Sequence, residues 1–171
     1  VRAVRDSRYK YIRNFIPHRP AYSFLDYAER GAIQQEIRRG ETEGGLPNAM
    51  IRLMQPKAAE ELYDLAVDPY ELRNLATQPA YQEVLESMRA ENREWMMRTG
   101  DLGLMPETDM IAECASDGDA SRILAGDAGK DRLSRIIAAA EAVGKGDRKA
   151  ILGALNAEDY VQRYWGCVGL G

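Results

Sequence analysis

The sequence is poor in histidine and cysteine, the residues of many metal and redox centres. Its 171 residues include 1 histidine and 2 cysteines. Cys114 and Cys167 are far apart and share no motif, so they predict neither a disulfide framework nor a metal site. We expect each to be a small buried apolar residue. No apolar run approaches the roughly 18 residues of a membrane span, and no membrane partner is expected.

Acidic residues outnumber basic ones in the chain as a whole, but not near the N-terminus. With 27 acidic and 23 basic residues, the formal net charge is −4, which argues against general nucleic-acid binding. The first 13 residues contain five basic residues and a single acid, Asp6. The basic residues are Arg2, Arg5, Arg8, Lys10 and Arg13. Two interpretations stay open. The charges protect an exposed edge strand from pairing with other chains, or they attract an anionic ligand.

The beginning of the chain predicts a β-hairpin. Residues 1–16 contain tyrosines and β-branched residues in alternating patterns, with a polar break at Asp6 and Ser7. Pro17 and Pro20 end the second strand, because proline cannot donate to a β-ladder. The chain starts inside this strand pattern and has neither an initial Met nor a signal peptide. We therefore expect a fragment of a longer protein, open at both ends.

A third strand and a tight corner follow further along the chain. Residues 60–65, EELYDL, form a compact apolar run with an aromatic, bounded by acids, which predicts a strand. Asp68 stands three residues before Glu71, and Pro69 follows it directly. This spacing predicts a capping box and a single helical turn, with proline at the first helical position.

Two helices complete this first part. Residues 22–40 predict a helical connection that Asp26 caps. Residues 79–99 carry apolar side chains at helical spacing, including Trp95 as a core residue, and Gly100 is placed to end the helix. The stripe must be buried, most simply across one face of the sheet.

The last third of the chain predicts short helices and no strand. Each is too short to be stable alone and must bury its apolar stripe against neighbours. Their expected N-caps are Asp119, Asp131, Asp147 and Asn156. The fold class is therefore α+β: a small antiparallel sheet packed by a long helix, then an all-α segment.

The corner motif resembles a known signature. EELYDL at 60–65, DPYE at 68–71 and NLA at 74–76 are similar to the closing signature of formylglycine-dependent sulfatases of the alkaline-phosphatase superfamily. Residues 1–5 and 8–13 resemble the two strands that open the C-terminal subdomain of those enzymes. The resemblance implies a sulfatase C-terminal subdomain at 1–101, incomplete at its N-terminus.

A second resemblance concerns the end of the chain. DYVQRYW at 159–165, followed by Gly169 and Leu170, resembles the first helix of a HEAT-type repeat. This implies a linker at 102–118 and the start of a truncated HEAT-like repeat region at 119–171. Some bacterial sulfatases resemble this layout. The alternative is a plain helical tail packed on the first domain.

The resemblance also states which chemistry to look for. It implies a formylglycine made from Cys or Ser in the pattern Cys/Ser-x-Pro/Ala-x-Arg, with calcium held by Asp and Asn. Cys114 precedes Ala-Ser-Asp-Gly and Cys167 precedes Val-Gly-Leu-Gly, so neither matches. We expect no catalytic residue, no metal ligand and no cofactor in this chain. Calcium and formylglycine are expected in a longer parent, whose missing N-terminal catalytic domain is the expected partner.

One substrate-binding hypothesis remains. Arg13, Asn14 and His18 lie where the second strand ends, and the resemblance places this subdomain beside the substrate cleft. Arg13 would pair with a sulfate or carboxylate and His18 would donate a hydrogen bond. The alternative is that all three merely support the loop.

Two functions stay open. The first is the C-terminal part of a sulfatase, a sulfuric ester hydrolase that acts on a sulfate ester, with the fragment inert alone. The second is a non-catalytic module whose helical repeats bind a partner protein. If the parent resembles bacterial sulfatases, it is expected in the periplasm or outside the cell.

Overall fold

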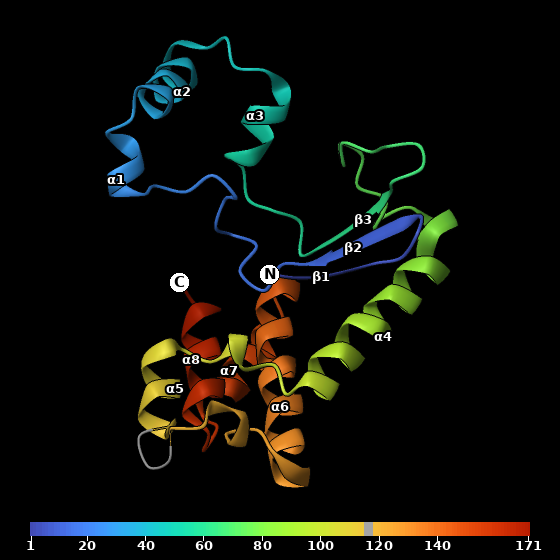
Figure 1. Ribbon diagram of the computed structural model, residues 1–171, viewed down its shortest axis with the longest axis vertical. Helices are drawn as coiled ribbons and strands as arrows, with labels where there is room; N and C mark the ends of the chain where they lie inside the picture. The colour runs from blue at the N-terminus through green and yellow to red at the C-terminus, as the bar shows by residue number, and fades with distance from the viewer. Residues whose placement is uncertain (115–117) are drawn as a thin grey trace. The chain divides into compact units, whose positions relative to one another are not determined.

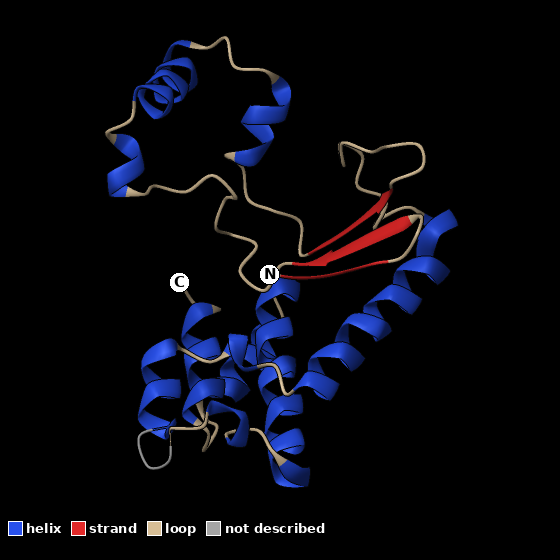
Figure 2. Ribbon diagram, viewed as in Figure 1, coloured by secondary structure: helices blue, strands red, loops and turns tan. Residues whose placement is uncertain are grey.

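The computed structural model describes residues 1–114 and 118–171, which form two compact units. Val1–Ile16 and Glu60–Gly171 make the first unit, and Pro17–Ala59 makes the second. The predicted α+β class is confirmed, since one antiparallel sheet is accompanied by helices in both units (Figures 1 and 2). The sheet belongs to the first unit.

The sheet has three strands in the order β1-β2-β3, and every pair is antiparallel. Its strands are β1 (Arg2–Arg5), β2 (Tyr9–Arg13) and β3 (Glu60–Asp64). The predicted hairpin is confirmed: the Asp6 carboxylate accepts hydrogen bonds from the backbone N–H groups of Arg8 and Tyr9 in its turn. Tyr11 at the centre lies opposite Val4 on one side and Leu62 on the other.

The segment after the corner returns to the outer edge of β3. Oδ1 of Asn74 accepts from the Leu62 N–H at 3.0 Å, and Nδ2 donates to the Glu60 carbonyl at 3.1 Å. The Leu75 N–H then donates to the Leu62 carbonyl at 2.8 Å. The asparagine of the NLA motif therefore satisfies backbone groups that have no neighbouring strand.

The corner itself differs from the prediction. No helix forms between β3 and residue 79, and the predicted helical turn after Asp68 is absent. The Asp68 carboxylate accepts from the N–H groups of Leu72 and Arg73, so it organises a loop. Glu71 has a φ of 56°, in the left-handed region, and cannot continue a right-handed helix. The capping-box interpretation was wrong because the Asp68 carboxylate accepts from N–H groups four and five residues on, which closes a loop and does not cap a first helical turn.

The long helix is confirmed. A 3₁₀ turn, η1 (Pro79–Tyr81), leads into α4 (Gln82–Thr99), which runs along the sheet in Figure 1. Gly100 ends it with a φ of 61°, as expected for a left-handed cap. Trp95, however, is 39% exposed and lies at the margin of the buried face, so its assignment to the core was wrong.

The C-terminal helices pack as one layer of the first unit. They are η2 (Leu102–Leu104), α5 (Glu107–Cys114), η3 (Ala120–Arg122), α6 (Gly126–Lys145), α7 (Arg148–Leu155) and α8 (Tyr160–Val168). The Asp147 cap is confirmed by its bond from the Ala150 N–H. Asp159, not Asn156, caps α8, and α6 begins before Asp131. Asp119 caps only a 3₁₀ turn.

Two groups of buried residues form the interior of this unit. The sheet cluster lies between the sheet and α4 and consists of Tyr11, Leu62, Leu75, Ala76, Leu85 and Met88. The helical cluster is larger and consists of Phe15, Met96, Leu104, Met105, Leu124, Leu133, Ile136, Ile137, Ala139, Ala140, Val143, Ala154, Val161 and Trp165. Within it, Nε1 of Trp165 donates to the Leu104 carbonyl at 2.8 Å.

The helical cluster contains residues from all three of the predicted segments 1–101, 102–118 and 119–171. Leu104 and Met105, in the expected linker, are buried together with residues of 119–171 and with Phe15. Residues 115–117 of that linker lie outside the described residues. The division of a longer protein into 1–101, 102–118 and 119–171 remains a prediction.

Cys114 is only partly buried and Cys167 is exposed, so the expectation of two buried cysteines was wrong.

Close packing of α7 on α8 requires glycine. A Cβ added at Gly166 would lie 2.7 Å from the Leu155 backbone nitrogen. One added at Gly169 would lie 2.9 Å from Cγ1 of Ile151. Gly169 is one of the residues that resemble a HEAT-type repeat, and both glycines allow the two helices to approach.

The second unit contains α1 (Asp26–Glu29), α2 (Ala32–Glu43) and α3 (Asn48–Leu53). The single connection expected at 22–40 is thus two helices, and Asp26 gives no side-chain cap because α1 starts at that residue. No residue of this unit is buried. Its exposed large apolar side chains are Phe24, Leu25, Tyr27, Ile33, Ile51 and Leu53.

Candidate functional site

Arg13 is an internal residue of the first unit. Its side chain is 4% exposed, and Nη1 lies 3.3 Å from Oε1 of Glu60. Nη2 donates to the Glu141 carbonyl of α6 at 3.2 Å, and the guanidinium lies 5.8 Å from the centre of the Phe15 ring. These contacts join β2 to β3 and to α6. In this arrangement, the cation supports the fold.

Glu60 collects the polar contacts on this side of the sheet. Nε of Arg89 on α4 donates to its Oε1 at 2.6 Å, and the Tyr11 hydroxyl donates to the same oxygen at 2.6 Å. Burial alone would raise the pKa of Glu60, but these donors and the nearby Arg13 lower it below its usual range. Burial and the Glu60 contact raise the pKa of the Tyr11 phenol. Glu60 is therefore charged at neutral pH and Tyr11 is not.

Asn14 is also buried, but its contact is separate. Its Nδ2 donates to Oε1 of Glu61 at 2.5 Å, and the other oxygen of Glu61 accepts from the Tyr63 hydroxyl at 2.5 Å. Arg13 and Asn14 therefore bind neighbouring glutamates of β3, since consecutive residues of a strand point to opposite faces. Neither side chain is presented to solvent.

His18 is different. It belongs to the second unit and is exposed. The structure therefore places Arg13 and Asn14 in one unit, on different contacts, and His18 in the other. A role of these residues in substrate binding stays a prediction, and His18 is the member whose exposure suits it best.

The basic N-terminal group is largely neutralised by acids distant in the sequence. The pairs are Arg2 with Asp101, Arg8 with Asp64, Lys10 with Glu71 and Arg13 with Glu60. Hydrogen bonds from the Arg8 guanidinium hold the pKa of Asp64 below its usual range. Sequence reasoning saw the cations but not their partners, because the pairing depends on how the strands and α4 come together. An anion site built from this group as a whole does not fit these contacts.

A second ion network joins three helices that the sequence did not connect. Arg132 of α6 binds Asp159 at 2.5 Å and Glu113 of α5 at 2.8 Å. The Tyr160 hydroxyl donates to the same Glu113. Burial and the Glu113 contact raise the pKa of Tyr160 to about 12. The network fixes α5 and the start of α8 on α6.

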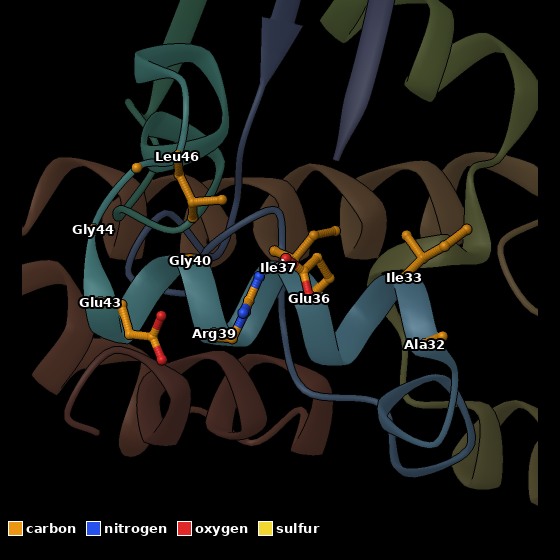
Figure 3. A pocket seen from close by; sticks show the side chains of 10 residues that line it. Ala32, Ile33, Glu36, Ile37, Arg39, Gly40, Glu43, Gly44 and Leu46 are labelled. Atoms are coloured by element: carbon orange, nitrogen blue, oxygen red, sulfur yellow. Dashed lines mark hydrogen bonds and ion pairs between the residues drawn. The ribbon is translucent and has the colours of Figure 1, made fainter.

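The second unit has a shallow groove beside α2. Figure 3 shows it lined by Ile33, Ile37, Leu46 and charged side chains of the helix. Leu46 covers Gly40, where an added Cβ would lie 2.7 Å from its Cδ2. Ile33 is 80% exposed, so the groove is an open apolar face with a polar rim.

The described residues contain no group of three or more His, Cys, Asp or Glu side chains placed to hold a metal ion. The calcium implied by the resemblance stays an expectation for a longer parent, outside residues 1–114 and 118–171. No helix within the same ranges combines the length and apolar character needed to cross a membrane.

Comparison with known proteins gives a consistent signal over more than half of the chain. No family model matches it. The curated relatives that it resembles are sulfatases, and the chain spans about a fifth of their length, between 18% and 20%.

One such relative is an ulvan-active sulfatase of Formosa agariphila, 42% identical over 112 residues, which are 65% of this chain and 19% of that protein. A second ulvan-active sulfatase of the same organism is 33% identical over 59% of this chain and 18% of its own length. The N-sulphoglucosamine sulphohydrolase of Homo sapiens is 29% identical over 59% of this chain and 20% of its own length.

Proposed function

We propose that this chain is the C-terminal part of a sulfatase and that it supports sulfate-ester hydrolysis in a longer protein. The observation that carries the proposal is the 42% identity to a sulfatase over 112 residues. The EELYDL, DPYE and NLA motifs support it, because they occur in the order of the family signature. In this proposal the chain by itself is inert.

The chemistry of the described residues favours a supporting role. Glu60 and Arg13, a largely buried ionic pair of the first unit, are engaged with Arg89, Tyr11 and α6. A catalytic group needs access to substrate and a pKa suited to proton transfer. The nucleophile and the calcium ligands belong, in this proposal, to a catalytic domain outside the chain. Calcium would there polarise the sulfate ester.

The second unit supports the proposed partner. A folded segment with no buried side chain and with several exposed large apolar residues gains stability when another surface covers it. We propose the catalytic domain of the same protein as that surface.

The direct experiment uses the complete reading frame that encodes this chain. The full-length protein is assayed with ulvan, with N-sulphoglucosamine and with a chromogenic aryl sulfate, beside the 171-residue chain alone. We expect sulfate release from at least one substrate by the full-length protein and none by the fragment. A full-length protein without the Cys/Ser-x-Pro/Ala-x-Arg motif would contradict the proposal.

The substrate-contact hypothesis needs a separate test, since Arg13→Ala would disturb the folded interior and His18→Ala would not. Arg13→Ala removes a buried cation and its contacts to Glu60 and to the Glu141 carbonyl, so lost activity would not identify a substrate contact. His18 is exposed, and His18→Ala leaves the interior intact. If His18 binds substrate, KM rises severalfold while the melting temperature is unchanged. The matched control is Arg19→Ala, at the neighbouring exposed position.

We also propose that α6–α8 begin a HEAT-like repeat that binds a partner protein. Support comes from the packing of α7 on α8 and from the apolar residues that these helices expose, Leu152 and Tyr164. Deletion of 119–171 from the full-length protein would then abolish partner capture and spare hydrolysis. Loss of folding of the remaining protein would instead favour a plain helical tail, because the helical cluster includes Phe15 and Met96.

A further inference from the structure

Two deeply buried donors of the first unit have no hydrogen-bond partner within the described residues. They are Nε of Arg13 and Nδ2 of Asn92. Asn92 is 3% exposed, and Arg13 is nearly as buried. A buried donor without an acceptor costs about 1–3 kcal/mol, so such groups are normally paired with protein or with an internal water. The two orphaned donors call for an acceptor.

Both residues lie at the boundary between the sheet cluster and the helical cluster. Along β2 and its extension, Arg13 stands between Tyr11 of the sheet cluster and Phe15 of the helical cluster. Tyr11 and Arg13 are alternate residues of β2 and share one face, and the Arg13 guanidinium lies 5.8 Å from the centre of the Phe15 ring.

The same order occurs on α4, which packs against β2. Asn92 stands between Met88 of the sheet cluster and Met96 of the helical cluster. Residues four apart lie on one face of a helix, so these side chains also point the same way. The strand segment and the helix therefore each contribute residues to both clusters, and each has one polar residue, Arg13 or Asn92, between these contributions.

Arg13 and the arginines of α4 contact the same two glutamates, Glu60 and Glu141. Arg13 and Arg89 both bind Oε1 of Glu60, at 3.3 Å and 2.6 Å. Arg13 also donates to the Glu141 carbonyl, and Arg93 lies 3.2 Å from the Glu141 carboxylate. Arg89 and Arg93, which lie close to Asn92 in the sequence of α4, therefore share the residues Glu60 and Glu141 with Arg13. We call this set the polar layer: Arg13, Glu60, Arg89, Asn92, Arg93 and Glu141.

We propose that Arg13 Nε and Asn92 Nδ2 donate to one shared small acceptor in the polar layer, either a water molecule or a halide ion. Two buried donors without an acceptor define this chemistry, because another donor could not satisfy them. The charges of the layer tolerate either occupant: three arginines face the carboxylates of Glu60 and Glu141, leaving one positive charge in excess. The site is independent of the proposed sulfatase function.

Crystallography of the 171-residue chain grown with sodium bromide tests the proposal. We expect one ordered peak within hydrogen-bond distance of both donors. A bromide anomalous signal identifies it as the anion, and its absence at an ordered peak identifies water. Donors that bond to two different protein acceptors, or that lie too far apart to share one atom, would overturn the proposal.

Two substitutions of Asn92 give a second, independent readout. Asn92→Asp places a carboxylate beside Arg13 Nε, so the ordered peak disappears while the melting temperature holds or rises. Asn92→Leu removes the amide and lowers the melting temperature by several degrees, about 2–4 °C for each lost kcal/mol. The control, Asn48→Asp, is at an exposed position and is expected to change little. If Asn92→Asp destabilises as much as Asn92→Leu, Arg13 is not adjacent and the proposal fails.

Discussion

Val1–Ile16 and Glu60–Gly171 enclose two hydrophobic clusters, whereas Pro17–Ala59 encloses no side chain at all. Their ion pairs differ in the same way. In the first unit, Arg2 pairs with Asp101 and Arg132 with Asp159. In the second, the ion pairs join near neighbours in sequence: Arg38 with Glu29 and Glu41, Arg39 with Glu36, and Arg30 with Asp26.

The difference shows where the stability of this chain resides. Burial of apolar surface is the main favourable term in folding, and short helices without it are marginal in water. The first unit buries apolar surface in its two clusters and fixes its elements with contacts between residues distant in sequence. The second unit depends on local contacts, so its conformation is the more open to change by a covering surface.

The largest contrast is expected from truncating one isoleucine in each unit. Ile137 is 0% exposed in the helical cluster and Ile33 is 80% exposed on α2. Ile137→Ala should lower the free energy of unfolding by about 2–5 kcal/mol, through lost burial and a cavity. Ile33→Ala should change it by less than about 0.5 kcal/mol. Denaturant unfolding measures both, and a large loss in Ile33→Ala would show that this face is covered.

A steric test within the first unit compares two glycines of adjacent helices. Gly166→Val drives a side chain into the backbone of Leu155 and should cost about 1–3 kcal/mol. Gly153→Ala meets nothing within 4 Å and should stabilise α7 by up to about 1 kcal/mol. Thermal unfolding gives both values. Equal effects would contradict the close approach of α7 and α8.

Acid should weaken the first unit through its long-range pairs. Burial would raise the pKa of Asp101, but hydrogen bonds from Arg2 and from the Gly103 N–H lower it overall. A carboxyl with a depressed folded pKa stabilises the protein above its unfolded pKa, about 3.9 for Asp, and loses this contribution as the pH falls through the folded value.

Asp101→Asn should therefore be less stable than wild type at pH 6, and the gap should narrow as the pH falls through the depressed folded pKa of Asp101. Unfolding in denaturant at several pH values measures the gap. In an Arg2→Gln background the pH dependence of the gap should shrink, because the main donor is gone. A gap that stays constant with pH would rule out this linkage.

The smallest effect is expected for the local ion pairs of the second unit. Arg38→Gln removes contacts to Glu29 at 2.8 Å and to Glu41 at 3.0 Å, both near the surface. We expect the free energy of local opening to fall by about 0.2–1 kcal/mol. Amide hydrogen exchange across α1 and α2 measures this change. Arg30→Gln, which breaks a more exposed pair, is the control and should fall at the low end.

Much of the fold was predictable because strong periodic patterns survive packing. The hairpin, the third strand, the long helix and the Gly100 stop all follow from alternation, helical spacing and a glycine cap. Local chemistry was less decisive where one motif serves two structures. Asp68 was expected to cap a helix, yet its carboxylate closes a loop in which Glu71 is left-handed.

The candidate site was less predictable, since it depends on distances between remote residues. Arg13 was singled out as a cation for an anionic ligand, but Glu60 and the Glu141 carbonyl hold it inside. Asn92, in the middle of a helical stripe, gave a weak signal as a polar residue between Met88 and Met96. An amide at a core position of a helix is the kind of exception that sequence analysis should flag.

The environment of Trp165 has a spectroscopic consequence. The chain has 2 tryptophans, and Trp165 is buried with its indole N–H bonded to the Leu104 carbonyl, whereas Trp95 is half-exposed. An aqueous quencher such as acrylamide should reach Trp95 first and leave the short-wavelength emission of Trp165. Native fluorescence thus contains two separable reporters, and the one that resists quenching records the integrity of the C-terminal helices.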